Sequence, residues 1–465
     1  MSKQDKKELR QQIACEWLEN NYLNYGSLRH DIVTDRLQIR VADLHSLEDA
    51  ASGYSLEFRG KDTWRNLTDK DINTMVCNCV AEAEVNINVT EMWTALKSDM
   101  VPAVHPIRAW IEGLKPYTED QPDWIDWLAR QVRVKDNNNP TTTTTNINNI
   151  DNENQQCQQL VNNAENNADR FWRQCFKKWF VAMVASWLKD EVVNHTVLVL
   201  VGRQGIFKTT WLDNLIPPEL RAYSSKLPLS GQITKDDRLR LCENAMLNID
   251  ELDAICGREM NIVKSLLTST DVNERAAYGR LKERRVRLAS FCASTNNREF
   301  LTDITGNRRW LPFEVESIQN PFHAIIPYEQ LYAQAVYLIE QGWYMYWFDL
   351  EEIEELEKHN EEFRAMENEE QLIPILFDIP AEGKGEFMTT AEISDKLVSY
   401  GGIKKPMSIR QLGMLLAKRG FQKKQVYLSG SNVRGWIVYK RHTDEIELLK
   451  KIDSHSATSQ PTNLY

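Results

Sequence analysis

Residues 198–212 read LVLVGRQGIFKTTWL, and this stretch decides the fold. The run LVLV predicts a short buried strand, and the residues after the turn have the spacing of a helix. Gly202, Lys208 and Thr209 fit the pattern G-x-x-x-x-G-K-[ST], in which backbone N–H groups at the start of a helix surround phosphate groups. Phe207 stands where the pattern has its second glycine. A left-handed phenylalanine there costs on the order of 1–2 kcal/mol, and its N–H can still donate to a phosphate.

Each part of this loop has a predicted role in binding ATP and Mg²⁺. Lys208 supplies a point charge to the β- and γ-phosphates, and Thr209 offers its hydroxyl to the metal ion. The predicted nucleotide contacts are Gly202, Arg203, Gln204, Gly205, Ile206, Phe207, Lys208, Thr209 and Thr210. The loop alone is a near match and leaves a coincidental resemblance open.

Polar residues at the ends of two later strands strengthen the prediction. The run MLNIDEL ends in Asp250 and Glu251, a pair suited to hold Mg²⁺ through water and to activate the attacking water, respectively. The run VRLASFCASTN ends in Asn296, which can hydrogen-bond the γ-phosphate or the attacking water. Short apolar strands separated by helical segments indicate a parallel α/β sheet, whose strands all end at one edge.

Two adjacent arginines, Arg308 and Arg309, follow in the stretch TGNRRW. Either is a candidate arginine finger, which stabilises transition-state charge across a subunit interface. Each feature alone has an ordinary alternative, such as a surface arginine pair or a strand-end turn. Their occurrence in this order predicts an ATPase site.

The composition is that of a soluble globular protein, with 42% hydrophobic and 26% charged residues and a net charge of -11. This charge argues against a protein that coats nucleic acid over its whole surface. No apolar run resembles a signal peptide or a membrane span, so we expect a cytoplasmic protein without membrane contact. The eight cysteines lack metal-ligand spacing, which predicts reduced thiols and no structural metal.

Pattern and composition divide the chain into six segments. They are a helical N-terminal region (1–135), an Asn/Thr/Gln-rich insertion expected to be disordered (136–168), the P-loop ATPase domain (169–345), an acidic helical linker (346–385), a winged helix-turn-helix (386–442) and a C-terminal tail (443–465).

Positive charge is concentrated in the last folded segment. Residues 386–442 carry eleven bases against three acids, whereas residues 349–370 carry eleven acids against two bases. Thr389-x-x-Glu392 and Ser408-x-x-Gln411 can cap two successive helices, and two alternating β runs joined by SGSN follow. This order predicts a winged helix-turn-helix, with DNA contact by Lys418, Arg419, Lys423 and Lys424. Protein contact is the alternative for such a module.

A second basic stretch, NERAAYGRLKERRVRL, predicts a β-hairpin between the acidic pair and the third strand. Its candidate DNA contacts are Arg280, Lys282 and Arg284, next to Tyr278, which can stack on a base. A solvated hairpin or a structural arginine network remains the alternative.

The succession of GRQGIFKTTW, NIDEL, RAAYGR, STNNREFLTD and TGNRRWLPFEV resembles the virulence-associated protein E family, which is similar to superfamily 3 helicases with an AAA+ fold. The resemblance covers roughly residues 60–345. It implies an AAA+ P-loop core that binds phosphate through Gly202, Gly205, Lys208 and Thr209, with Asp250 and Glu251 at the metal and water, Asn296 as sensor and Arg308 or Arg309 as finger. Phe207 departs from the family pattern.

The resemblance further implies an ATP-dependent DNA helicase or replication-initiation ATPase of a phage or mobile genetic element. Such a protein acts as a homo-oligomeric ring, expected to be a hexamer, on single- or double-stranded DNA. No primase domain is evident in the sequence, so a separate primase or other replication proteins are expected partners. An ATP-regulated DNA-binding initiator without unwinding activity is the alternative.

Overall fold

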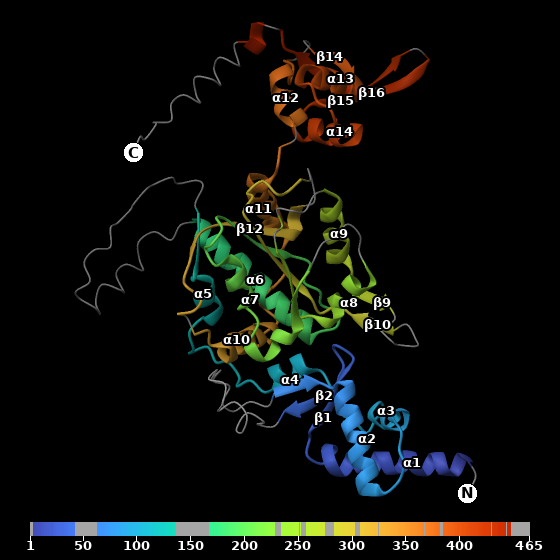
Figure 1. The fold of residues 1–465 in the computed structure, drawn as a ribbon. Coiled ribbons are helices and arrows are strands. Elements are labelled where there is room, and N and C mark those ends of the chain that lie inside the picture. Colours follow the sequence, from blue (N-terminus) through green and yellow to red (C-terminus); the bar gives the residue numbers. More distant parts are fainter. Residues whose placement is uncertain are drawn as a thin grey trace, which may run out of the picture. The chain divides into compact units, whose positions relative to one another are not determined.

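The computed structural model describes most of the chain in ranges separated by gaps. The described residues are 3–41, 63–135, 167–227, 234–250, 252, 257–274, 283–302, 307–323, 325–366, 368–381, 385–428, 430–442 and 444–447. The chain forms two compact units (Figure 1). The first comprises Met1–Asn296 and Arg309–Glu352, and the second comprises Asn297–Arg308 and Ile353–Tyr465.

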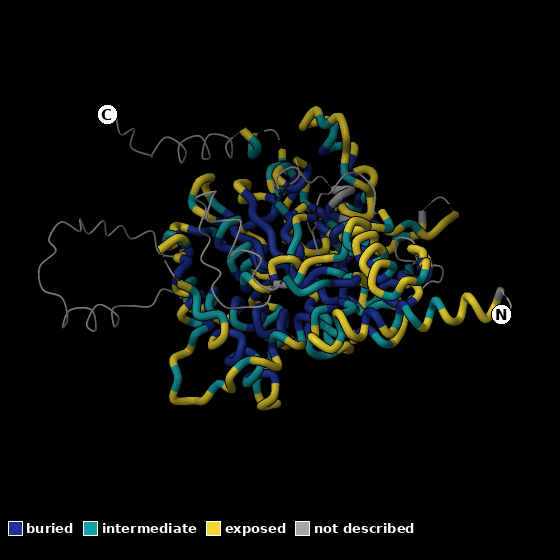
Figure 2. Tube along the Cα trace, turned by 60° about the horizontal axis from the view of Figure 1, so that its bottom comes forward, coloured by how far each residue is buried: buried dark blue, intermediate teal, exposed yellow. Residues whose placement is uncertain are grey.

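A six-stranded sheet forms the centre of the first unit, with the strand order β5-β12-β6-β11-β8-β7. β6, β7, β8, β11 and β12 run parallel, and the short edge strand β5 is antiparallel to β12. Every residue of β6, β8 and β11 is buried, and these strands fall in the dark blue part of Figure 2. The predicted parallel α/β sheet is therefore confirmed. Its strands are β5 (Val132–Val134), β6 (Val197–Val201), β7 (Ser224–Lys226), β8 (Met246–Ile249), β11 (Ser290–Thr295) and β12 (Trp310–Ile318).

The long helix α6 (Asn167–Leu188) packs on this sheet through large aromatic side chains. Trp179 and Trp187 are fully buried, and their indole N–H groups donate to the carbonyls of Phe291 and Ala245. These bonds satisfy polar groups that burial would otherwise leave without a partner. The other helices of this part are α5 (Trp124–Ala129), α7 (Lys208–Asp213), α8 (Lys235–Glu243), α9 (Gly257–Thr268), α10 (Tyr328–Glu340) and the 3-10 helix η5 (Pro218–Tyr223).

The N-terminal region contains helices and a four-stranded sheet, β3-β2-β1-β4. The helical periodicity predicted α2 and α3, which capping boxes at Thr68 and Asn88 begin. The sheet was not predicted, because its strands are short and two of them, β2 and β3, are separated by more than twenty residues. The elements are α1 (Lys3–Leu18), η1 (Glu19–Leu23), β1 (Leu28–Asp31), β2 (Arg36–Val41), β3 (Thr63–Asn66), α2 (Asp69–Ala83), α3 (Val89–Leu96), β4 (Ala103–Val104) and α4 (Pro106–Glu112).

The second unit has a helical and β-hairpin core of its own. Thr389 and Ser408 cap its central helices with complete capping boxes, as the sequence predicts. Leu397, Leu412 and Trp436 belong to one buried apolar cluster that joins both helices to the hairpin. The elements are α11 (Leu350–Asn360), η8 (Glu361–Phe363), α12 (Asn368–Leu376), β13 (Phe377–Asp378), β14 (Glu386–Thr389), α13 (Thr390–Gly401), α14 (Ile409–Lys418), β15 (Gln422–Leu428) and β16 (Ser431–Lys440).

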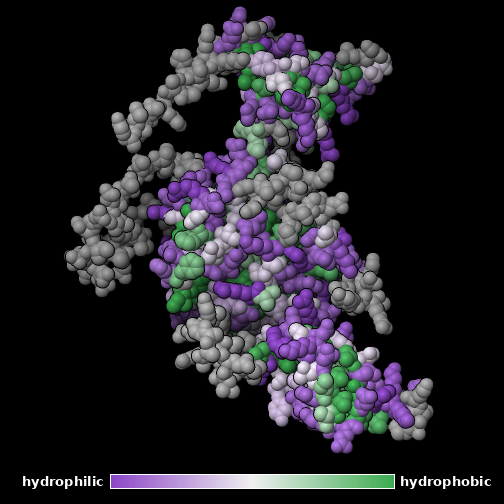
Figure 3. All heavy atoms as spheres, in the orientation of Figure 1, coloured by the Kyte–Doolittle hydropathy of each residue, from purple (hydrophilic) through white to green (hydrophobic). Residues whose placement is uncertain are grey.

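Residues 136–166 of the insertion predicted to be disordered, and most of the C-terminal tail, lie outside the described residues, whereas residues 167 and 168 begin the helix α6. Hydrophilic residues predominate on the face of the molecule drawn in Figure 3. Of the helices that the structure describes, none combines the length and apolarity that crossing a bilayer requires.

Candidate functional site

The glycine-containing loop directly follows the buried strand β6. Gly202 and Gly205 have φ of 153° and 84°, a region that favours glycine. A Cβ atom at Gly202 would lie 3.0 Å from the carbonyl oxygen of Val315 in β12, so the backbone passes too close for a side chain. Both glycines are therefore required by the path of the loop.

Phe207 adopts the left-handed conformation, with φ 65° and ψ 18°, immediately before α7. This is the conformation that the missing glycine would have taken without strain. The ring of Phe207 packs edge-to-face on Phe322, with centroids 6.2 Å apart. Such contacts stabilise by about 0.5–1.5 kcal/mol, which offsets much of the backbone cost.

Lys208, the first residue of α7, is only 7% exposed. Its ammonium donates to the carbonyl oxygens of Gly202 at 2.6 Å and Arg203 at 2.7 Å. It also donates to Oδ1 of Asn296, at 3.0 Å. The lysine thus joins the loop after β6 to the residue after β11, and its charge is held at the mouth of the loop.

Thr209 lies within a small group of oxygen atoms from three elements. Its hydroxyl is 3.1 Å from the hydroxyl of Ser294 and 3.5 Å from Oδ1 of Asp250. The Ser294 hydroxyl is also 3.5 Å from that carboxylate oxygen. Two hydroxyls and one carboxylate are hard oxygen ligands of the kind that Mg²⁺ accepts together with water and phosphate oxygens, so these residues fit the predicted ion.

Lys226 was not predicted to belong to the site. It is the last residue of β7, and its ammonium lies 2.5 Å from Oδ2 of Asp250. The two oxygens of this carboxylate therefore face different partners, Lys226 on one side and Thr209 with Ser294 on the other. No sequence motif marks a lysine at the end of an edge strand, so the sequence alone could not have identified Lys226. Ser294 could have been identified, because it lies at the same strand end as Asn296.

Asn248 explains the polar residue inside the otherwise apolar strand β8. It is 1% exposed and donates from Nδ2 to Asp213, the last residue of α7, at 2.8 Å. This bond ties the C-terminal end of the helix to the strand that ends beside Asp250. Burial, with the negative charges of Asp213 and Asp250 nearby, raises the pKa of the Cys292 thiol well above its usual range. Cys292 is a buried free thiol of the core, as the sequence predicts for most of the cysteines.

Three predicted site residues occupy other positions. Glu251 lies outside the described residues. Arg308 is exposed and Arg309 is half-buried in the turn Asn307–Arg309. Burial lowers the pKa of Lys264 in α9, and the positive charge of Arg309 lowers it further, so Arg309 lies close to that helix. Among the described residues, no carboxylate forms an ion pair with either arginine.

The predicted basic hairpin exists as β9 (Asp271–Glu274) and β10 (Glu283–Val286), and its tip, with Arg280 and Lys282, lies outside the described residues. Arg284 is 77% exposed and pairs with Asp271 at 2.7 Å. Arg285 bonds to Glu243.

Arg287 is fully buried and donates to the backbone carbonyls of several surrounding residues. Burial lowers its pKa to about 9. It supports the fold, so the structural alternative holds for this arginine.

The basic residues predicted to bind DNA in the second unit fall into two groups. Lys418 bonds to Glu361 at 2.5 Å, and Arg419 donates to the carbonyl of Glu370 at 3.0 Å. Lys423 and Lys424 lie exposed on β15, and Lys423 is 5.9 Å above the ring of Trp436. The first pair therefore holds the acidic segment of its own unit, and the second pair faces solvent.

The fold and the site together define a mixed α/β protein with a lysine-bearing loop after a central parallel strand. Residues 145–365 match the family model of the virulence-associated protein E-like domain, and this segment contains the loop and every strand-end residue described above. Residues 145–365 are therefore similar to a virulence-associated protein E-like domain.

Comparison with other proteins adds little to this match. No curated protein matches the chain. Similar solved structures include the apo structure of the NrS-1 C-terminal region (305-718), with 11% identity, a TM-score of 0.42 and coverage of 90% of this chain and 97% of that chain. An A form apo structure of the same region has 10% identity and a TM-score of 0.39, with coverage of 90% and 98%. These values are too low to establish a shared fold.

Proposed function

We propose that the first unit binds and hydrolyses ATP with Mg²⁺ at the carboxyl ends of β6, β8 and β11. The observation that carries this proposal is the convergence of residues that are far apart in the sequence. Lys208 contacts Asn296, and Thr209 contacts both Ser294 and Asp250. In an open parallel sheet, ligands bind outside the carboxyl ends of the strands. They bind where the connections from two neighbouring strands run in opposite directions along the sheet. β6 has this position, since β11 and β12 flank it while the chain continues to β7 at the far edge.

Under this proposal each residue has a role. The N–H groups of the loop and the Lys208 ammonium bind the phosphates, and Thr209, Asp250 and Ser294 hold the ion, which neutralises charge on the phosphates. Asn296 orients the γ-phosphate or the attacking water, and Glu251 accepts a proton from that water. Arg308 or Arg309 of a neighbouring subunit completes the site in a ring, expected to be a hexamer, by stabilising charge in the transition state.

The second unit is proposed to bind DNA as a winged helix-turn-helix. Two capped helices followed by an antiparallel hairpin support this assignment. Lys423 and Lys424 expose their charges on the hairpin, which suits contact with phosphates. Arg280 and Lys282, which lie in the sequence between β9 and β10, are proposed to contact a single strand during translocation.

Together these activities describe a DNA helicase or replication-initiation ATPase of a phage or mobile genetic element. The family match supports this context. The test is an ATPase and strand-displacement assay with and without single-stranded DNA, in which wild type is compared with Lys208→Ala. We expect DNA-stimulated turnover and unwinding in wild type, with a loss of turnover on the order of 100-fold in the variant.

Two further outcomes decide between the alternatives. ATPase activity and duplex binding without strand displacement would identify a DNA-binding initiator that uses ATP only as a switch. Equal turnover in wild type and Lys208→Ala would contradict the ATPase proposal. Glu251→Gln should bind ATP normally and stop turnover, and normal turnover in that variant would remove Glu251 from the mechanism.

A further inference from the structure

In the described part of the chain, the outer half of the C-terminal hairpin has no third strand beside it. β14 pairs with β16 from Gly435 to Val438, whereas residues 431–434 pair with residues 425–428 alone. A Cβ atom at Gly435 would clash with the carbonyl oxygen of Met388, so only glycine fits where β14 and β16 meet. Beyond that point the outer ribbon, residues 425–428 and 431–434, projects from the second unit (Figure 1).

The register divides the side chains of the outer ribbon between two faces. Lys423 lies opposite Trp436, and its ammonium is 5.9 Å from the indole ring, so these two side chains share a face. Side chains alternate along a strand, and the same face therefore continues outward as the polar face of the ribbon. Its members are Gln425, Tyr427, Asn432 and Arg434. The opposite face carries Val426 and Val433, which lie directly across from each other.

The polar face exposes hydrogen-bonding groups and no negative charge. All four of its side chains are exposed, and no Asp or Glu occurs in residues 422–440. Among the described residues, Arg434 forms no ion pair with a carboxylate. Arginine can donate two hydrogen bonds to guanine, and the amide of Gln or Asn can bond twice to adenine. The polar face therefore combines the side chains that recognise base edges.

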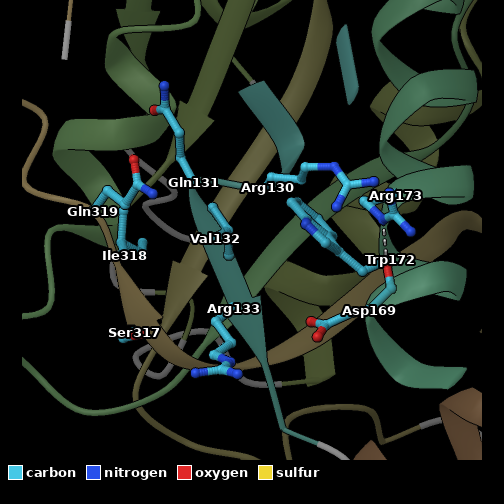
Figure 4. Close-up of a pocket in the computed structure, with 10 residues that line it drawn as sticks. All are labelled: Arg130, Gln131, Val132, Arg133, Asp169, Trp172, Arg173, Ser317, Ile318 and Gln319. Carbon is cyan, nitrogen blue, oxygen red and sulfur yellow. Dashed lines mark hydrogen bonds between the residues drawn. The ribbon is translucent and has the colours of Figure 1, made fainter. Parts of the chain in front are cut away.

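Three arginines also line a hollow of the first unit, but carboxylates already lie beside them (Figure 4). Arg130 and Arg173 both donate to Asp126. Arg133 lies 3.7 Å from Glu316. An anionic ligand would have to compete with these carboxylates for the arginines. The guanidinium of the outer ribbon has no such carboxylate partner in the described part of the chain.

The second helix of a helix-turn-helix commonly contacts the bases, but α14 offers few groups for that role. Its exposed side chains include the apolar Ile409 and Met414. The side chain of Gln411 is held in the capping box at the start of the helix. The two cations at the other end of the helix are bonded to the acidic segment of the same unit. Arg410 is exposed, and the polar face of the ribbon presents the larger set of base-reading groups.

We propose that the polar face of the outer ribbon reads base edges in the major groove of duplex DNA. The inference rests on the proposed DNA binding by the second unit and adds a sequence preference to it. The major groove, about 12 Å wide, admits a two-stranded ribbon. Positions 432 and 434 are roughly 7 Å apart along β16, about the rise of two base pairs.

Two side chains of the polar face have defined roles in this proposal. Arg434 donates to O6 and N7 of a guanine, and Gln425, directly across from it, bonds to N6 and N7 of a neighbouring adenine. Lys423 and Lys424 lie where the ribbon joins the unit, and they contact phosphates and fix the register on the duplex. The ribbon thus determines which sequence is bound, whereas the lysines add affinity for any sequence.

The test selects binding sites for the full-length protein from duplexes with a randomised centre of about one helical turn. Wild type should enrich a motif in which one guanine is preferred at least about fivefold over other bases. Arg434→Lys keeps the charge and loses the paired donors. The guanine preference should disappear, and affinity for unselected duplex should change by less than about twofold. Arg410→Lys is the matched control on α14 and should keep the motif.

Gln425→Ala gives a second, independent measurement, because it should remove the preference for adenine and keep the preference for guanine. The groove is tested with 7-deazaguanine at the selected position, which lacks the N7 acceptor. This base should weaken binding by wild type and leave binding by Arg434→Lys unchanged.

Three outcomes would overturn the ribbon proposal. Two of them are duplex binding by wild type without an enriched motif, and binding by wild type that 7-deazaguanine does not weaken. The third is loss of the guanine preference in Arg410→Lys but not in Arg434→Lys, which would assign base reading to α14. Each of these leaves DNA binding by the second unit standing. Failure of wild type to bind any duplex would overturn both proposals.

Discussion

The edge of the central sheet and the C-terminal hairpin both carry basic residues, but they hold them in opposite ways. At the sheet edge, Lys208 is buried and bonded to two carbonyls and an amide oxygen. On the hairpin, Lys423 and Lys424 are exposed to solvent. The hydrogen bonds of Lys208 hold its ammonium group in one position. The exposed ammonium groups of Lys423 and Lys424 contribute instead to a positive electrostatic potential over the surface of the hairpin. Single substitutions should therefore have large effects around the sheet and small, additive effects on the hairpin.

Substitution of Arg287 should have the largest effect, because its buried charge is bonded to several backbone carbonyls. Arg287→Met leaves carbonyls such as those of Leu267 and Asn194 without their donor, and each such loss costs on the order of 1–3 kcal/mol. We expect the free energy of unfolding to fall by about 3 kcal/mol or more, measured by urea denaturation. Arg284→Met is the control, because that exposed pair with Asp271 contributes at most about 1 kcal/mol. Equal losses in the two variants would break the comparison.

Substitution of Thr209 tests whether its hydroxyl is a ligand of the Mg²⁺ ion proposed to bind at the sheet edge. Thr209→Val keeps the shape of the side chain and removes the hydroxyl that lies beside Asp250 and Ser294. The Mg²⁺ concentration for half-maximal ATPase activity should rise by about tenfold, as expected when one ligand is lost from a site. Thr210→Val should change it much less, because Thr210 is expected to contribute its backbone N–H. A similar shift in both variants would show that the hydroxyl of Thr209 is not a ligand.

The hairpin should respond more weakly. Lys424→Ala should reduce DNA affinity only a few-fold and lower the slope of log K against log salt by about 1, since one phosphate contact is lost. Lys418→Ala serves as the comparison, because its ammonium is bonded to Glu361 and should release fewer counterions. Filter binding over a range of salt concentrations measures both slopes. A larger change of slope for Lys418 than for Lys424 would assign DNA contact to α14 instead of the hairpin.

Local signals in the sequence predicted most of what the structure shows at both regions. The parallel strands follow from apolar runs, and the helix starts at Thr389 and Ser408 follow from capping boxes. The contact between Lys208 and Asn296 follows from the rule that parallel strands end at one edge. These features depend on residues close in sequence, or on a single rule of topology.

Long-range pairing was harder to predict. The N-terminal sheet joins strands separated by helices and by a segment without clear pattern, so no local periodicity marks it. The same holds for Lys226, whose position beside Asp250 depends on the register of β7 with β8. Arg287 belongs to a basic run in the sequence, and only packing shows that it is buried. Charge patterns alone therefore do not separate structural arginines from those that face a ligand.

Substitution of Phe207 should have the smallest effect of the changes considered, because its favourable and unfavourable contributions nearly cancel. Phe207→Gly removes a left-handed strain of about 1–2 kcal/mol, but it also removes the ring contact with Phe322, worth about 0.5–1.5 kcal/mol. Glycine further gains entropy in the unfolded chain, which costs about 0.5–1 kcal/mol. These terms nearly cancel, so thermal unfolding should shift by no more than a few degrees and ATPase activity should persist. Abolished activity in a folded Phe207→Gly variant would instead show that the aromatic ring, through Phe322, holds the loop in the shape that binds phosphate.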